Sequence, residues 1–105
     1  MVKKLLFFIF LICSVVGYSQ NKITKLTASP NPFTNSTTIT FNSDSEQNIT
    51  FSVRNVIGKT ILVKKIKVKK GKNSIPFSKN NLKSGMYLYS IRSEVKVTSK
   101  RFVIR

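Results

Sequence analysis

Side chains able to do acid–base or metal chemistry are few in this sequence. Its 105 residues include no histidine, which removes the commonest general base and a common metal ligand. The three carboxylates are Asp44, Glu46 and Glu94, in segments of turn-forming composition, and any carboxylate pair would have to come from them. Neither G-x-S-x-G nor S-x-x-K appears with a supporting pattern. We therefore expect no enzymatic activity, no metal and no cofactor.

The first twenty residues have the composition of a secretory signal peptide. Two lysines precede an apolar run, Leu5–Val16, and small and polar residues follow it. That run is shorter than the about 20 residues that a membrane-spanning helix needs. We expect Met1–Gln20 to be removed by cleavage after Ser19, since Gly17 and Ser19 are small enough for the peptidase, or alternatively after Gln20.

The single cysteine, Cys13, lies inside this apolar run. An acylated cysteine would anchor a lipoprotein, but Ile12 stands where that processing needs a small residue, so we interpret Cys13 as apolar filler. Residues 21–105 then contain no cysteine, and disulfides and thiol chemistry are not expected. They are long enough for one domain with a single core and contain no candidate membrane span.

The charge of the chain is strongly basic. Lysine and arginine number 19 and the formal net charge is +16, or +14 once the two lysines of the signal peptide are removed. Such an excess attracts polyanions. In KKIKVKKGK, the candidate anion-binding residues Lys65, Lys67 and Lys69 share one strand face, although a solvated face that protects a sheet edge is the alternative. Lipopolysaccharide phosphates or acidic polysaccharides fit better than nucleic acid, because the cluster lacks aromatic residues for base stacking.

The remaining pattern predicts β-strands. Apolar and polar residues alternate in Thr37–Phe41 and again in Ile49–Val53, with a polar turn between them. Gly58 supplies a tight reversal. From Lys59 to Lys70 the apolar phase slips, which predicts a bulge near Lys64 and Lys65.

The second half of the chain continues this pattern. Pro76 between two apolar residues predicts an edge strand, while GMYLYSI has apolar residues on both faces, as a central strand does. Leu82 is expected to point inward. A last strand, about Val95–Ile104, should bury Phe102 and Ile104. About seven short strands predict an antiparallel, immunoglobulin-like β-sandwich at 21–105, with 21–25 as its only linker.

Four motifs in order carry a resemblance. SPNPF, VRNVIGKTI, LKSGMYLYSI and the terminal SKRFVIR together resemble the C-terminal sorting domain of the type IX (Por) secretion system. The motif of that family falls on Pro30, Asn31, Pro32, Phe33, Gly58, Gly85, Tyr87, Ile91, Lys100, Arg101, Phe102, Val103, Ile104 and Arg105.

The resemblance implies a secretion address in a gram-negative bacterium. The chain would reach the periplasm, and the type IX machinery would recognise the folded domain and export it to the surface or the medium. A sortase-like surface peptidase commonly removes such domains while attaching cargo to anionic lipopolysaccharide. Here no large cargo separates the signal peptide from SPNPF, so the chain is expected to be a free-standing domain with its own role, the product of a truncated or misannotated gene, or a small secreted protein that uses most of itself as its address.

Simpler interpretations of the same residues remain open. The prolines of SPNPF can serve packing alone, by leading rigidly into the first strand with Phe33 as a plug at the end of the sandwich. Tyr87 and Tyr89 are typical of core and rim aromatics, and both glycines of backbone turns. A small secreted immunoglobulin-like adhesin or polyanion-binding module is the alternative function.

Overall fold

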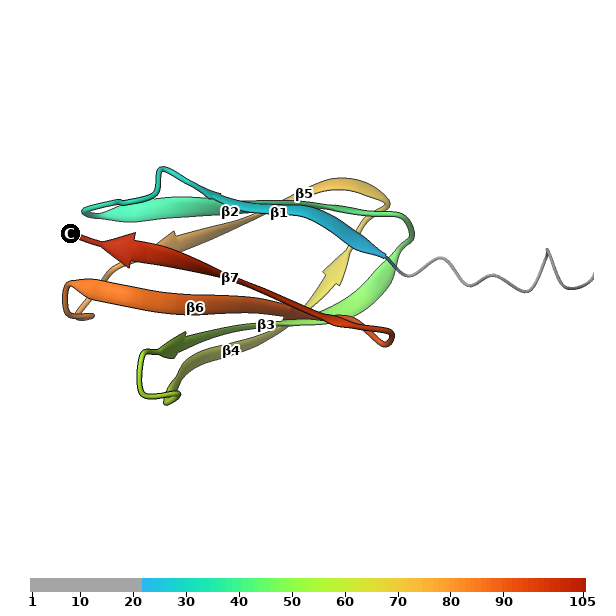
Figure 1. Ribbon diagram of the computed structural model, residues 1–105. Helices are drawn as coiled ribbons and strands as arrows, with labels where there is room; N and C mark the ends of the chain where they lie inside the picture. The colour runs from blue at the N-terminus through green and yellow to red at the C-terminus, as the bar shows by residue number, and fades with distance from the viewer. Residues whose placement is uncertain (1–21) are drawn as a thin grey trace, which may run out of the picture.

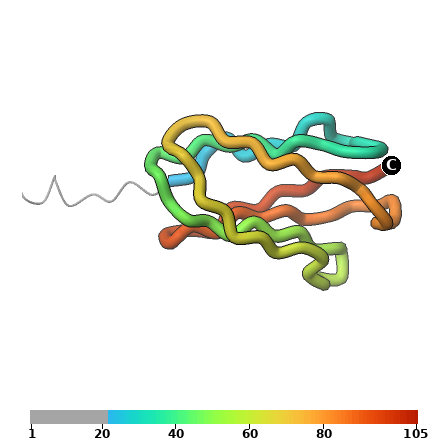
Figure 2. Tube along the Cα trace, turned by 180° about the vertical axis from the view of Figure 1, so that it is seen from behind, coloured from blue at the N-terminus to red at the C-terminus, as the bar shows by residue number. Residues whose placement is uncertain are grey.

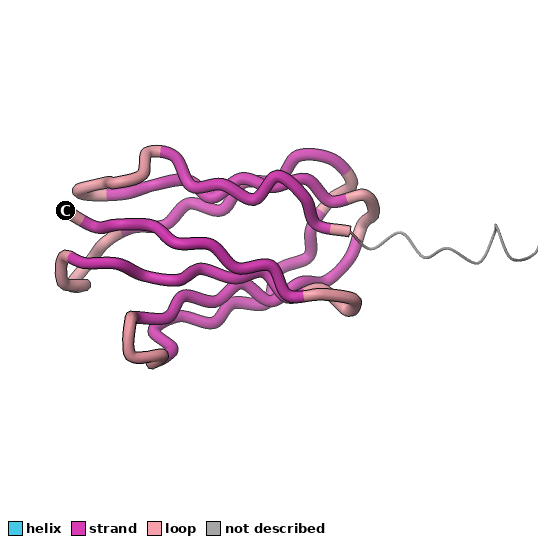
Figure 3. The backbone as a smooth tube through the Cα atoms, viewed as in Figure 1, coloured by secondary structure: helices cyan, strands magenta, loops and turns pink. Residues whose placement is uncertain are grey.

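The computed structural model describes residues 22–105, which form seven antiparallel strands and, within that range, no helix. The predicted signal peptide and its cleavage at Ser19 or Gln20 lie outside the described residues. The strands form two sheets, ordered β1–β2–β5 and β4–β3–β6–β7, which face one another (Figures 1 and 3). Their bounds are β1 Ile23–Ser29, β2 Ser36–Ser43, β3 Gln47–Asn55, β4 Thr60–Val68, β5 Gly71–Ser78, β6 Gly85–Arg92 and β7 Val97–Ile104.

The core lies between the sheets and follows from the alternation within the strands. Every second residue of β2, β3 and β6 is buried, and β7 adds its last two inward residues. The most deeply buried side chains include Phe41, Phe51, Tyr89 and, as predicted, Phe102 and Ile104. The prediction of an all-β, antiparallel, seven-stranded domain is confirmed.

The two ends of the sandwich carry different segments. The tail end, as we name it, holds the β1–β2 loop (30–35), the β3–β4 turn (56–59), the β5–β6 loop (79–84) and Arg105. The opposite end holds the β2–β3, β4–β5 and β6–β7 connections. Figures 1 and 2 show the C-terminus near the β1–β2 and β5–β6 loops, with the β3–β4 turn farther away at the same end. Segments distant in sequence therefore lie at one end.

Several strand predictions are confirmed by the sheet order. Strand β5 lies at an edge, where Pro76 pairs with Thr38, and β6 lies between β3 and β7. Leu82 is partly buried against the core. Strand β7 begins at Val97, two residues later than predicted, because the β6–β7 turn takes up the preceding residues.

The predicted linker at residues 21–25 is wrong, because β1 already begins at Ile23. The alternation that would have identified β1 is interrupted: its register with β2 shifts between Thr24 and Thr27, and Lys25 has a φ of 55°. Consequently SPNPF does not lead into the first strand but joins β1 to β2.

The predicted bulge near Lys64 and Lys65 is also wrong. The β3–β4 pairing runs without interruption from the pair of Gln47 with Val68 to the pair of Val53 with Leu62. The register shift between the two strands lies next to the turn, where Arg54 pairs with Thr60. Lys64 shares the strand face of Leu62 and Ile66 yet is exposed. Because β4 is an edge strand, the long side chain of Lys64 reaches water from this position without a bulge.

The β3–β4 turn depends on Gly58. Its φ is 85°, and the Asn55 carboxamide oxygen accepts hydrogen bonds from the N–H groups of Ile57 (3.2 Å) and Lys59 (2.9 Å). We expect Gly58→Ala to lower the free energy of unfolding by about 1–2 kcal/mol, the penalty of a left-handed backbone, since an added Cβ would meet no atom within 4 Å. Denaturant unfolding tests this, with exposed Lys59→Ala as control; equal stability of the two variants would contradict it.

Candidate recognition site

The SPNPF segment lies along the outer edge of the C-terminal strand. Phe33 forms a parallel bridge with Ile104. The Phe33 N–H donates to the carbonyl oxygen of Val103 at 3.0 Å, and the Arg105 N–H donates to the carbonyl oxygen of Phe33 at 2.8 Å. The loop thus continues the sheet beyond β7, at the edge that β6 does not pair.

The side chain of Asn31 extends this pairing by one more residue of β7. Its Nδ2 donates to the carbonyl oxygen of Arg101 at 3.2 Å, and its Oδ1 accepts from the N–H of Val103 at 3.0 Å. A carboxamide has the donor and acceptor of a peptide group, so Asn31 acts here as a short piece of extra strand. We call the four bonds made by Asn31 and Phe33 the tail latch.

The loop is fixed on its other side to β2. The Thr37 hydroxyl, in a buried residue, donates to the carbonyl oxygen of Pro30 at 2.7 Å. The peptide bonds before Pro30 and Pro32 are both cis. Sequence reasoning did not single out Thr37, and the only sequence signal for it was a threonine at an inward position of an alternating strand.

An aromatic cluster supports the latch from inside. The centre of the Phe102 ring lies 5.2 Å from the ring centres of Phe33 and Phe77. It lies 5.3 Å from the ring centre of Tyr89, on which it stacks, and 6.1 Å from that of Tyr87. The Tyr87 hydroxyl donates to the carbonyl oxygen of Lys83 at 2.7 Å. Burial raises the pKa of Tyr89, so its ring serves packing as a neutral phenol. Phe33 is buried as a plug, as expected.

Most of the predicted sorting-motif residues meet at the tail end. Gly85 pairs with Ile104, and Tyr87 pairs with Phe102, directly beside the latch. Gly58 lies in a separate turn at this end. Ile91 lies elsewhere, fully buried toward the opposite end, where it pairs with Phe51 and Thr98.

Charge is divided between the two ends. The chain has only three acidic side chains, and all of them lie at the opposite end, Asp44 and Glu46 between β2 and β3 and Glu94 between β6 and β7. Asp44 accepts a hydrogen bond from the Lys22 N–H there at 2.7 Å. The side-chain charges of the tail end are all positive, on Arg54, Lys59, Lys79, Lys83, Arg101 and Arg105. The opposite end also carries lysines, among them Lys69 and Lys70, so the two ends differ in that only the tail end has no acidic side chain to offset its positive charge.

The candidate anion site is only partly assembled. Lys65 and Lys67 share the outer face of β4, but the prediction that Lys69 joins them is wrong, because β4 ends at Val68 and the Lys69 N–H bonds to the Asn73 side chain in the turn. Lys67 pairs with Glu46 at 3.1 Å, both side chains being largely exposed, so the pair adds little stability.

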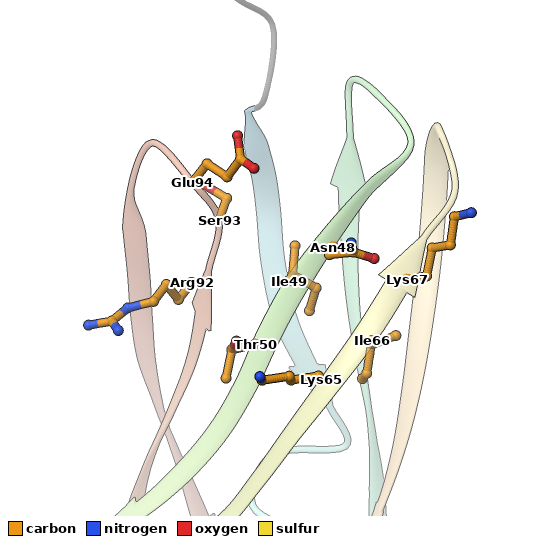
Figure 4. Close-up of a pocket in the computed structure, with 9 residues that line it drawn as sticks. All are labelled: Asn48, Ile49, Thr50, Lys65, Ile66, Lys67, Arg92, Ser93 and Glu94. Atoms are coloured by element: carbon orange, nitrogen blue, oxygen red, sulfur yellow. The ribbon is translucent and has the colours of Figure 1, made fainter.

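A hollow of about 620 Å³ lies beside these lysines, lined by Asn48, Ile49, Thr50, Lys65, Ile66, Lys67, Arg92, Ser93 and Glu94. Figure 4 shows the charged ends of Lys67 and Arg92 pointing away from one another. Diverging cations do not enclose a single anion. The hollow is instead consistent with a solvated basic face.

Residues 22–105 contain no group of three or more His, Cys, Asp or Glu side chains positioned to hold a metal ion. Nor do they contain a helix with the length and apolar character needed to cross a membrane.

The fold and site define a two-sheet β-sandwich whose C-terminal strand is held at its edge by a loop near the start of the domain. The family model described as "Secretion system C-terminal sorting domain" matches residues 27–105, and the chain belongs to this family. The resemblance inferred from the four motifs is thereby confirmed.

Comparison with individual proteins adds little. No curated protein matches the chain. Among solved structures, a β-glucosidase from Listeria innocua in complex with glucose is similar over 84% of this chain, with a TM-score of 0.43 and 15% identity. The match spans 16% of the glucosidase chain.

Proposed function

We propose that residues 22–105 are a sorting signal that the type IX secretion system recognises in the folded state, at the tail end. The tail latch is the observation that carries this proposal. It joins two of the motifs that carry the resemblance, SPNPF and the C-terminal tail, into one surface, although Asn31 and Arg101 are 70 residues apart in sequence. A receptor that contacts this surface can distinguish the folded domain from an unfolded chain.

The route and the fold assignment are part of the same proposal. Met1–Gln20 directs the chain to the periplasm and is cleaved after Ser19 or Gln20, and the immunoglobulin-like sandwich then passes the outer membrane to the surface or the medium. Removal of the domain by a sortase-like peptidase and contact with anionic lipopolysaccharide follow from the family resemblance. The sheet order β1–β2–β5 against β4–β3–β6–β7 supports the immunoglobulin-like assignment.

Export of a reporter tests the function. Residues 21–105 are fused behind a periplasm-exported fluorescent protein in a host with the type IX machinery, and fluorescence is measured in medium, surface and periplasm. We expect reporter outside the cell, and none there in a strain that lacks the machinery. Reporter confined to the periplasm of the intact host would overturn the proposal.

Deletion of Phe102–Arg105 is expected to abolish this export, because it removes β7 residues of both the core and the latch. Since that deletion also unfolds part of the core, a second variant extends the chain by a few glycine and serine residues after Arg105, which is exposed. We expect the extension to leave the melting temperature unchanged and to reduce export at least about tenfold, about 1.4 kcal/mol of recognition. Lys65→Glu/Lys67→Glu is the control, and normal export of both tail variants would refute recognition of the tail.

A further inference from the structure

The outer face of the four-stranded sheet changes character along its length. Toward the opposite end one row presents Lys65, Thr50, Arg92 and the exposed Val97, and the central row combines serines with the exposed Val63. At the tail end several large apolar side chains lie next to one another. Met86, Leu88 and Val103 remain 41%, 38% and 38% exposed there, although they lie on a paired sheet.

These side chains border a shallow hollow of about 330 Å³, the tail-end hollow, lined by Val56, Met86, Tyr87, Leu88 and Arg101. Val103 pairs with Met86 at its rim. Val56 of the β3–β4 turn is 67% exposed, and the neighbouring Ile57 is 82% exposed. A contiguous apolar surface of this kind, next to the latch, marks an interaction site more often than isolated exposed residues do.

Arginines stand on both sides of Leu88, and one of them, Arg101, also lines the hollow. Leu88 pairs with Arg54 on β3 and with Arg101 on β7, so one row across the outer face reads arginine, leucine, arginine. Neither arginine has a carboxylate partner, because the acidic side chains of the chain lie at the opposite end. Arginine is enriched among interface hot spots, and the two arginines here flank an apolar centre that a partner side chain can cover.

We propose that the tail-end hollow binds a protein segment that carries an apolar side chain flanked by carboxylates. The apolar side chain fills the space over Leu88 and Met86, and the carboxylates pair with Arg54 and Arg101, which fixes the orientation of the partner. The proposal rests on the proposed function, since the segment belongs to the secretion machinery that recognises the tail end. A second copy of this chain is a poor occupant, because a two-fold contact would bring the arginines of both copies together.

Two variants of the full chain, carrying the reporter between the signal peptide and the domain, test the hollow in the export assay. Leu88→Gln removes the apolar centre, and Arg54→Glu reverses one flanking charge at a residue outside the latch. We expect each to lower export about tenfold or more, the loss of one hot-spot contact of about 1.4 kcal/mol. Arg54→Lys, which keeps the charge, is expected to retain most of the export.

Matched controls lie on the same outer face. Val63→Gln removes a valine that is 58% exposed on β4, and Arg92→Glu makes the same charge change at the other end of β6. Both are expected to be exported within about twofold of the parent, about 0.4 kcal/mol. Melting temperatures of the purified variants verify folding; should Leu88→Gln fail to fold, Arg54→Glu alone decides.

The outcomes separate this inference from the proposed function. Normal export of folded Arg54→Glu overturns the hollow as a docking site, while loss of export in the C-terminally extended chain still supports recognition of the tail. Equal losses in Arg54→Glu and Arg92→Glu would overturn it in favour of a general attraction of the positive face to an anionic surface, such as lipid. A parent chain that stays in the periplasm refutes the proposed function itself.

Discussion

Replacement of Phe102 by alanine is expected to lower the free energy of unfolding by about 3–5 kcal/mol, a large part of what a domain of this size possesses. Phe102 is fully buried and contacts four other aromatic rings, from Phe33 to Tyr89. The surrounding structure relaxes only partly after such a truncation, so the cost includes a cavity left by the ring. Denaturant unfolding of the purified domain measures the loss.

Two comparisons make this prediction specific. Phe102→Leu keeps much of the volume and is expected to cost less than half as much, whereas alanine at the exposed neighbour Arg101 should change stability by less than about 1 kcal/mol. In the export assay, Phe102→Ala should be degraded or retained in the periplasm. A Phe102→Ala domain as stable as the Arg101→Ala domain would show that the aromatic cluster does not support the tail.

Replacement of Asn31 by alanine is expected to loosen the C-terminal tail while the sandwich stays folded. The variant loses the hydrogen bonds to Arg101 and Val103, worth about 1–3 kcal/mol together at most, and water can replace them at this exposed edge. We expect amide hydrogen exchange of Val103 to accelerate about tenfold or more. The core amides of Phe51 and Tyr89 exchange through global opening, so they should accelerate only by the factor that the loss of global stability sets, whereas the Val103 amide also loses its own acceptor.

The function of the latch is tested with the same variant. Asn35→Ala, in the same loop, is the matched control, since the side chain of Asn35 is exposed and its contact with Lys79 is made by the main chain. Asn31→Asp keeps the acceptor for Val103 and loses the donor to Arg101, so its effect should be intermediate. We expect export to fall in the order Asn35→Ala, Asn31→Asp, Asn31→Ala. Unchanged exchange at Val103, or normal export of Asn31→Ala, would refute a role for the latch.

The strands were predictable because their signal is local. Alternation with a period of two in β2, β3 and β6 is visible in a few consecutive residues. A proline such as Pro76 indicates an edge strand by its residue type alone, because it has no N–H to donate to a neighbouring strand. β1 was missed because the positive φ at Lys25 interrupts the same alternation. The bulge predicted near Lys64 was wrong for a related reason. Lys64 can reach water because β4 is an edge strand, and the local sequence does not show the position of β4 in the sheet.

The site was predictable only in its pieces. The four motifs indicated the family, which the family model confirms over residues 27–105. Which of them touch was not determined by sequence, because contact depends on the crossings between the two sheets. Those crossings bring SPNPF to β7 and leave Ile91 buried at the other end.

By itself the sequence determined an all-β domain, the family to which it belongs, a strong positive charge, and a C-terminal strand with Phe102 and Ile104 inward. Tertiary structure decided that Asn31 completes the edge of that strand, that every acidic side chain lies at the other end of the sandwich, and that Leu88 stands between two arginines. The physical reason is the range of the interactions. Strand patterning records which face of a short segment is buried, whereas the latch, the charge division and the hollow arise between segments whose neighbours are set only when both sheets pack.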